Sequence, residues 1–162
     1  MKYAIWLDGV VLDVDLTELL YKKFKGDKDV NLPYTFNVHK DWEDFYSKIK
    51  GKDIVFLSPY DERTTREIIE KVFKNDVIKF IPSMSKPEKK CLGRLFSEFP
   101  EFQPLETAII GSSPLDLLSA RFYDSRIKVL CVNRYTSCAK YSPYLMANSL
   151  EELYDLMVKL KL

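Results

Sequence analysis

No apolar run in this 162-residue sequence approaches the roughly 20 residues that a helix needs to cross a bilayer. The N-terminus also lacks the long apolar core of a signal peptide. We therefore expect a cytoplasmic protein without a membrane-spanning segment.

Cysteine is scarce, and its three positions form no CxxC pair. The residues are Cys91, Cys131 and Cys138. An odd number fits a reducing compartment better than a framework of disulfides. Two of them stand in apolar or helical surroundings, so we expect buried free thiols.

Neither sign of charge dominates the sequence. Lysine and arginine total 25 against 24 for aspartate and glutamate, which gives a formal net charge of +1. This balance predicts no general attraction to nucleic acid or membrane. Lys86, Lys89, Lys90 and Arg94 stand at helical spacing with aromatic residues nearby. We interpret them as a solvated helix face, with nucleic-acid binding as the less favoured alternative. The single histidine, His39, is assigned no metal or base role.

Short apolar runs alternate with amphipathic stretches along the chain. This alternation predicts an α/β domain with a parallel sheet and right-handed crossovers. The length suits one core rather than two. Strands are predicted at 3–7, 53–57, 77–81, 107–110 and 127–132, with short strands allowed at 34–36 and 144–146. Helices are predicted near 16–24, 41–50, 59–75, 85–96, 114–122 and 149–160.

Small or acidic residues follow several of the predicted strands. Asp8-Gly9 follows the first strand, Ser58 the second, and Gly-Ser-Ser-Pro-Leu-Asp at 111–116 the fourth. Lys86 opens a later helix, just before a proline. Because ligand sites in open α/β sheets lie at the carboxyl ends of strands, we expect these residues to gather at one edge.

The order and spacing of these motifs resemble the haloacid dehalogenase-like (HAD) superfamily of phosphohydrolases over nearly the whole chain. Its signatures are a DxDGT-type first loop, a Ser or Thr after the second strand, a Lys opening a later helix, and GDxxxD after the fourth strand. The resemblance implies a Rossmann-like three-layer sandwich with a mainly parallel sheet of about five strands, forming a single domain over 1–162. It also implies a small or absent cap, with residues 16–50 as the place for a minimal helical insertion.

The resemblance assigns a role to four residues, and each also has a structural alternative. Asp8 matches the acid/base residue, or is a turn carboxylate. Ser58 and Lys86 match phosphate-binding positions, or are a strand-end cap and a surface lysine. Asp116 matches a metal ligand, or is an acid in the first turn of a helix.

Two positions depart from the family pattern. Trp6 stands where the nucleophilic Asp belongs, and Ser112 stands where a metal-binding Asp belongs. An indole cannot ligate a cation, and a hydroxyl does not replace the charge of a carboxylate beside Mg²⁺. We therefore predict a protein that has lost phosphatase chemistry, needs no cofactor, and acts as a ligand-binding or protein-interaction module. Ser58 and Lys86 could still hold a phosphate-containing ligand.

A shifted register provides the alternative. Residues 13–17 spell DxDxT, which would place a nucleophile at Asp13 and an acid at Asp15, with the Asp8-Gly9 turn joining an extra strand. The protein would then be an active Mg²⁺-dependent HAD-like phosphatase. The helix that begins near Thr17 leaves no room for the loop-and-flap segment that the family places after its nucleophile, which favours the first register.

Tyrosine is frequent in the polar segment 135–144. Tyr135, Tyr141 and Tyr144 fall within it. Because tyrosine is enriched at contact surfaces, this segment predicts a protein partner, with a packed loop as the structural alternative.

Overall fold

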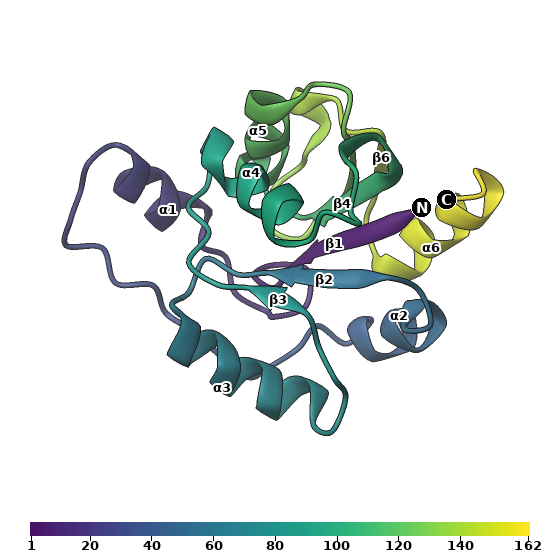
Figure 1. The fold of residues 1–162 in the computed structure, drawn as a ribbon, viewed down its shortest axis with the longest axis horizontal. Helices are drawn as coiled ribbons and strands as arrows, with labels where there is room; N and C mark the ends of the chain where they lie inside the picture. Colours follow the sequence, from purple (N-terminus) through teal and green to yellow (C-terminus); the bar gives the residue numbers. More distant parts are fainter.

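A computed structural model describes all 162 residues, and its centre is a six-stranded sheet (Figure 1). The strand order is β3-β2-β1-β4-β5-β6, and every neighbouring pair is parallel. The strands are β1 Lys2–Trp6, β2 Ile54–Leu57, β3 Phe80–Ile81, β4 Thr107–Gly111, β5 Lys128–Val132 and β6 Leu145–Ala147. The predicted α/β class with a parallel sheet is confirmed.

Helices cover the sheet on both faces, which gives the predicted three layers. Figure 1 shows α4 and α5 above the sheet and α2 and α3 below it, and α6 packs against α2. The helices are α1 Thr17–Phe24, α2 Trp42–Ile49, α3 Glu62–Phe73, α4 Lys89–Glu98, α5 Pro114–Tyr123 and α6 Leu150–Lys159, with short 3₁₀ turns at Pro104–Glu106 and Ala139–Tyr141. A single core of 42 buried apolar residues lies between the layers.

The first strand lies at the middle of the sheet because its side chains are apolar on both faces. Residues 3–6 of β1 are fully buried, between β2 and β4. The order of strands reverses at this point, since the chain adds β2 and β3 on one side and β4 to β6 on the other. Such a reversal opens a crevice at the carboxyl ends of the strands, where ligand sites of this architecture lie.

Three strand predictions need correction. The sheet has six strands rather than about five, because the short strand near 144–146 pairs with β5. Residues 34–36 form no strand. The strand predicted at 77–81 is reduced to two residues because this edge pairs only with the end of β2, and Val77 is 98% exposed.

The segment 16–50 divides into two parts. The helix α2 belongs to the layer below the sheet, where the buried Trp42 ring packs against Phe56 and Phe73. The helix α1 and the loop after it stand away from the sheet at the left of Figure 1. Only this second part stands out from the three layers.

The cysteines differ from expectation. The sulfur atoms of Cys131 and Cys138 form a disulfide, although both were predicted as free thiols. The turn after β5 brings the two side chains together in the core, which a sequence separation of 7 does not reveal. Cys91 is a buried free thiol, as predicted. The structure contains no helix with the length and apolar character needed to cross a bilayer.

Candidate functional site

A buried lysine lies at the centre of the expected site. The ammonium of Lys86 lies 2.7 Å from Asp8 Oδ2 and 2.5 Å from Asp116 Oδ1, and the lysine side chain is 0% exposed. Asp8 follows β1, Lys86 precedes α4, and Asp116 lies in the first turn of α5. Three sequence-predicted residues therefore meet at the carboxyl edge of the sheet, beside the reversal of strand order.

Electrostatics keeps this lysine charged. Burial would lower the pKa of Lys86, but the carboxylates of Asp116 and Asp8 outweigh burial and hold that pKa above its usual range. Two carboxylates share one ammonium, and no other cation lies within 4 Å of either carboxylate. The ammonium thus supplies the positive charge of the site.

The indole of Trp6 forms the wall of this cluster. Trp6 ends β1 with no exposed surface, and Lys86 Nζ lies 4.1 Å from the centroid of its ring. This geometry is a cation–π contact in a desolvated place. Neither Trp6 Nε1 nor Asp8 Oδ1 has a hydrogen-bond partner within the chain. The Trp6 side chain therefore packs against the lysine and presents no oxygen to the cluster.

Asp116 is held by backbone as well as by the lysine. Its Oδ2 accepts hydrogen bonds from the backbone N–H groups of Ser112 (2.9 Å) and Ser113 (3.1 Å), and Ser113 forms a capping box with it. Burial raises the pKa of Asp116, and Lys86 opposes that rise. The Asp116 side chain lies directly against Gly111. Only a glycine leaves room for it, because a Cβ at position 111 would lie 2.6 Å from Asp116 Oδ2. Asp116 is therefore an acid in the first turn of α5, and its other carboxylate oxygen contacts the ammonium of Lys86.

Ser58 remains within its own loop. It is fully buried after β2, its hydroxyl lies 2.8 Å from the hydroxyl of Thr65, and it accepts a hydrogen bond from the backbone N–H of Tyr60. These contacts are those of a strand-end cap, the structural alternative for this position. The structure shows no polar contact between Ser58 and Lys86.

The carboxylates of the shifted register lie outside the cluster. Asp13 is 59% exposed at its side chain and accepts a hydrogen bond of 2.7 Å from the Tyr135 hydroxyl. Asp15 is exposed and accepts from the backbone N–H of Thr17. The residues between Asp8 and Asp13 form no strand, so the first apolar run is the central strand and not an added one. The lysine faces Asp8 rather than these two acids.

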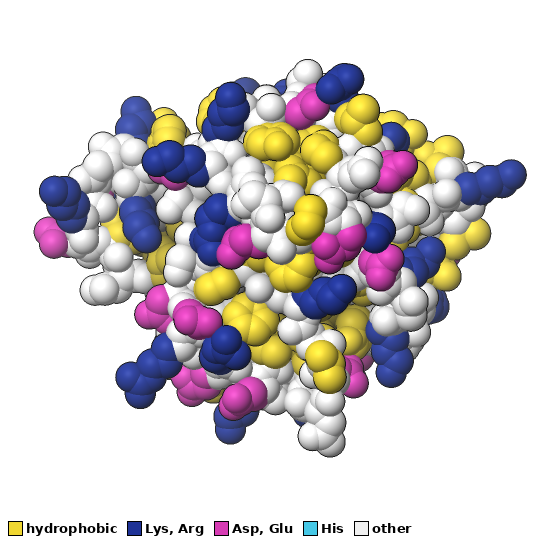
Figure 2. Space-filling view, in the orientation of Figure 1, with side chains coloured by type: hydrophobic (Ala, Val, Ile, Leu, Met, Phe, Trp, Pro, Cys, Tyr) yellow, Lys and Arg dark blue, Asp and Glu magenta, His cyan; other side chains and the backbone are white.

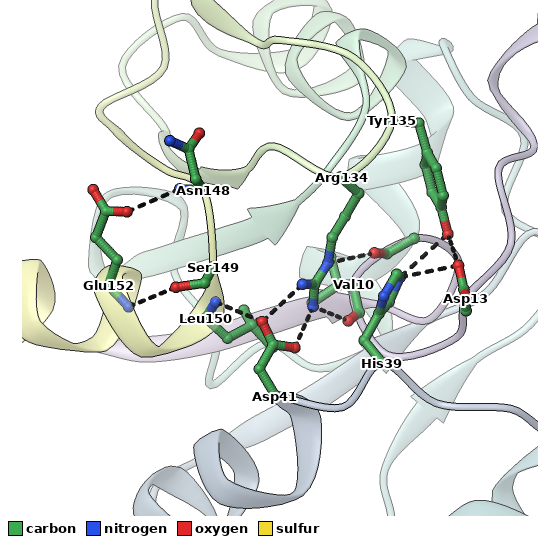
Figure 3. A network of polar contacts seen from close by, with 11 residues as sticks. Val10, Asp13, His39, Asp41, Arg134, Tyr135, Asn148, Ser149, Leu150 and Glu152 are labelled. Atoms are coloured by element: carbon green, nitrogen blue, oxygen red, sulfur yellow. Dashed lines mark hydrogen bonds and ion pairs between the residues drawn. The ribbon is translucent and has the colours of Figure 1, made fainter.

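A second polar network, absent from the sequence prediction, holds the loop after β1 (Figure 3). The guanidinium of Arg134 donates to the backbone carbonyls of Gly9 and Val10 and, through two nitrogens, to both carboxylate oxygens of Asp41. Asp41 also accepts from the backbone N–H of Leu150 at the start of α6. We call these contacts the Arg134 clasp.

The clasp has identifiable electrostatic effects. Burial would raise the pKa of Asp41, but its hydrogen bonds from Arg134 and Leu150 lower it below the usual range. Beside it, His39 Nε2 lies 3.2 Å from the Tyr135 hydroxyl, and burial together with Arg134 lowers the pKa of His39. The only indication of the Arg134 clasp in the sequence was the position of Arg134 just after a predicted strand, which places it at the same edge of the sheet as Asp8.

The side chains at the site do not fit Mg²⁺. Trp6, at the end of β1, has no oxygen to offer, and the ammonium of Lys86 lies against the carboxylates of Asp8 and Asp116. No group of three or more His, Cys, Asp or Glu side chains in the chain is arranged to hold a metal ion. Mg²⁺ prefers near-octahedral oxygen ligands, and this cluster does not offer them.

Comparison with known proteins shows similarity in fold but not in sequence. The chain matches no protein-family model and no curated protein. One similar structure is that of YfnB from Bacillus subtilis, which is described as a HAD hydrolase bound to magnesium. It aligns with a TM-score of 0.75 at 12% sequence identity, over 96% of this chain and 98% of that one. The haloacid dehalogenase-like family protein SP0104 from Streptococcus pneumoniae aligns with a TM-score of 0.70 at 13% sequence identity, over 96% of this chain and 97% of that one. The haloacid dehalogenase-like protein of unknown function ATU0790 from Agrobacterium tumefaciens aligns with a TM-score of 0.70 at 9% sequence identity, over 100% of both chains. The chain therefore has the haloacid dehalogenase-like fold that its motifs predicted.

Proposed function

We propose that this chain is a binding protein with the haloacid dehalogenase-like fold that has lost phosphatase chemistry. One observation carries the proposal: the ammonium of Lys86 is enclosed by Asp8, Asp116 and the ring of Trp6, with 0% of its side chain exposed. Phosphoryl transfer to a carboxylate needs an attacking oxygen, a cation to offset charge, and space for the phosphate. At the position that the resemblance assigns to the nucleophile, Trp6 offers no oxygen, and its ring lies against the ammonium of Lys86.

The alternative of an active phosphohydrolase through Asp13 and Asp15 has less support. Both acids are bonded to neighbouring groups of the chain, and Lys86 does not face them. A Mg²⁺-dependent assay with p-nitrophenyl phosphate separates the two functions. We expect no turnover from the wild type. Turnover that disappears in Asp8→Asn would refute the loss of chemistry, and turnover that disappears only in Asp13→Asn would establish the alternative.

A gain-of-function variant tests the reason for the loss. The double substitution Trp6→Asp with Ser112→Asp restores both missing carboxylates, and we expect it to gain a Mg²⁺-dependent rise in melting temperature that the wild type lacks. Adding Asp116→Asn should weaken that rise, because it removes a third ligand. If Mg²⁺ stabilises the wild type equally, the two substitutions do not account for the loss of the metal site.

The binding role and location are also proposals. The segment 135–144 is proposed to contact a protein partner, chiefly through Tyr144, which is 51% exposed, since the Tyr135 hydroxyl is bonded to Asp13. We propose a cytoplasmic location because Cys91 is a free thiol, although a disulfide such as Cys131–Cys138 is commoner in oxidising compartments. Free thiols can be blocked during lysis and then counted by mass spectrometry. The number of free thiols per chain distinguishes a reducing from an oxidising compartment.

A further inference from the structure

The segment 77–81 forms an open edge of the sheet. Its last two residues are β3, the outermost strand, which lies beside β2 on the side away from β1 (Figure 1). Figure 2, in the same view, shows hydrophobic side chains in the middle of this face, among lysines, arginines and acids. No further strand of the chain pairs with β3 on its outer side. The edge is therefore open to a partner.

The backbone of this segment is only partly paired. The carbonyl of Lys79 accepts a hydrogen bond of 2.9 Å from the N–H of Phe56 in β2. Because successive backbone groups of a strand point to opposite sides, Ile78 and Phe80 direct theirs away from β2. The N–H and C=O groups of Val77 and Ile78 form no backbone hydrogen bond within the chain. Such a row of free donors and acceptors is a template for one more strand.

The residues of this segment favour a strand that the chain completes only at one end. Val77, Ile78 and Phe80 are β-branched or aromatic, types that are enriched in strands. Only Phe80–Ile81 form a strand, and the Val77 side chain is 98% exposed. A strand added on the open side supplies the missing hydrogen bonds and covers part of Val77. It would therefore extend β3 to the length that the sequence predicts.

The charges beside the segment indicate the chemistry of its partner. A hollow of about 220 Å³ lies against the segment, and three lysines line it: Lys50, Lys52 and Lys79. The single acid that lines the hollow, Asp53, is paired with Lys2 at 3.4 Å. Asp76 is bonded to the Tyr46 hydroxyl, and Glu101 lies 4.0 Å from Lys79. Lys50 and Lys52 form no ion pair, so these two lysines are free to meet an acid of a partner.

We propose that the segment 77–81 binds an extended, acidic segment of a partner protein as an added strand beside β3. Ile78 and Phe80 hold this strand through their N–H and C=O groups, and an acidic side chain near its end faces Lys50 and Lys52. A second copy of this chain is the poorer occupant, because it would bring its own Lys79 and the same lysines to the joint.

This surface is separate from the two surfaces discussed above. The segment 135–144 precedes β6, which is the opposite edge of the sheet. The Trp6–Lys86 cluster lies at the carboxyl ends of the strands, whereas residues 77–79 lie before the amino end of β3. The proposal therefore goes beyond the proposed function, and the two can fail separately.

Selection from a phage library of random peptides of about ten residues tests the proposal. We expect enrichment of sequences that alternate apolar residues and contain at least one Asp or Glu. The selected peptide should bind Ile78→Pro at least about tenfold more weakly, because proline removes the free N–H. The matched control Ile78→Ala loses the same side chain but keeps the N–H, and it should bind within about threefold of the wild type. Melting curves of both variants control for folding.

Backbone methylation of the peptide tests strand pairing in the unchanged protein. N-methyl groups on the alternate residues that face β3 should abolish binding, whereas the same number on the other residues should leave it intact. K50Q/K52Q should weaken binding about two- to tenfold. The control K25Q/K140Q makes the same change of charge at exposed lysines elsewhere and should bind like the wild type.

Three outcomes would overturn the proposal. One is that no peptide is enriched over a selection without the protein. Another is equal loss of binding in Ile78→Ala and Ile78→Pro, or indifference to the position of methylation, which would identify a side-chain pocket instead of strand pairing. The last is enrichment of peptides without acids, or a dimer in sedimentation that Ile78→Pro abolishes, which would identify another partner or a second copy.

Discussion

Replacing Lys86 by methionine tests the structure of the central cluster most directly. The substitution removes the ammonium and keeps an unbranched side chain of similar length. Removing one partner of a buried ion pair costs about 3–5 kcal/mol, and a desolvated cation–π contact adds about 1–2 kcal/mol. Because the ammonium contacts Asp8, Asp116 and the Trp6 ring, we expect a loss of about 4–7 kcal/mol in the free energy of unfolding. For a chain of this size the melting temperature should fall by about 10–20 °C.

The pH dependence of that loss identifies its cause. In the wild type the pKa of Lys86 is raised, so its contribution is present below the ordinary lysine pKa of about 10.5 and is lost as pH rises through the higher folded value. In Lys86→Met, Asp8 and Asp116 face each other without a cation. Burial raises the pKa of Asp116, and protonation of this carboxylate relieves the repulsion, so the deficit relative to the wild type should shrink as pH falls from 7 to 4.

Urea unfolding followed by circular dichroism measures both effects. The neutral variant Asp8→Asn/Lys86→Met/Asp116→Asn should recover most of the lost stability, because no charge remains buried without a partner. Lys90→Met, on the exposed face of α4, serves as the matched control and should change stability by less than about 0.5 kcal/mol. A loss below about 1 kcal/mol in Lys86→Met, or a deficit that does not vary with pH, would refute the buried charge cluster.

Three further predictions concern the surroundings of the cluster. Arg134→Lys should cost about 2–3 kcal/mol in the free energy of unfolding. A lysine ammonium cannot donate at once to both carboxylate oxygens of Asp41 and to the carbonyls of Gly9 and Val10 in the geometry of the guanidinium. The cost should diminish as pH falls through the lowered Asp41 pKa, and an unchanged denaturation midpoint at pH 7 would contradict the clasp. Gly111→Ala should cost about 1–3 kcal/mol through its clash with Asp116, whereas Gly51→Ala, with no atom within 4 Å, should be nearly neutral. Burial raises the pKa of Cys91 to about 12, so only about one thiol in 10,000 is ionised at pH 8 and thiol reagents should not label the native protein. After denaturation without reductant one thiol should react, and after reduction three; rapid labelling of the native chain would show that Cys91 is accessible.

Local patterns in the sequence predicted most of the fold. The alternation of apolar runs and amphipathic stretches indicated the helices and the central strands, because burial on both faces leaves a continuous apolar run. The short edge strands were less predictable, since their pairing depends on a neighbour more than on their own residues. For this reason 77–81 shrank to Phe80–Ile81, whereas residues 145–147 joined the sheet.

The site was predictable in its members but not in its contacts. The motif spacing indicated Asp8, Lys86 and Asp116, yet burial of the lysine between two carboxylates follows only when loops 30 residues or more apart converge. The pairing of Arg134 with Asp41 spans 93 residues and leaves no periodic signal. Long-range polar pairs of this kind depend on tertiary structure, which local propensity does not report.

The Arg134 clasp anchors the loop after β1. Its guanidinium already satisfies the carbonyls of Gly9 and Val10, so this loop is anchored by its own chain and does not require a bound molecule to become ordered. Amide hydrogens there should exchange with solvent as slowly as those of the middle strands, through opening of the whole domain rather than local fraying. The carboxyl edge of the sheet beside β1 is thus held by contacts within the chain itself.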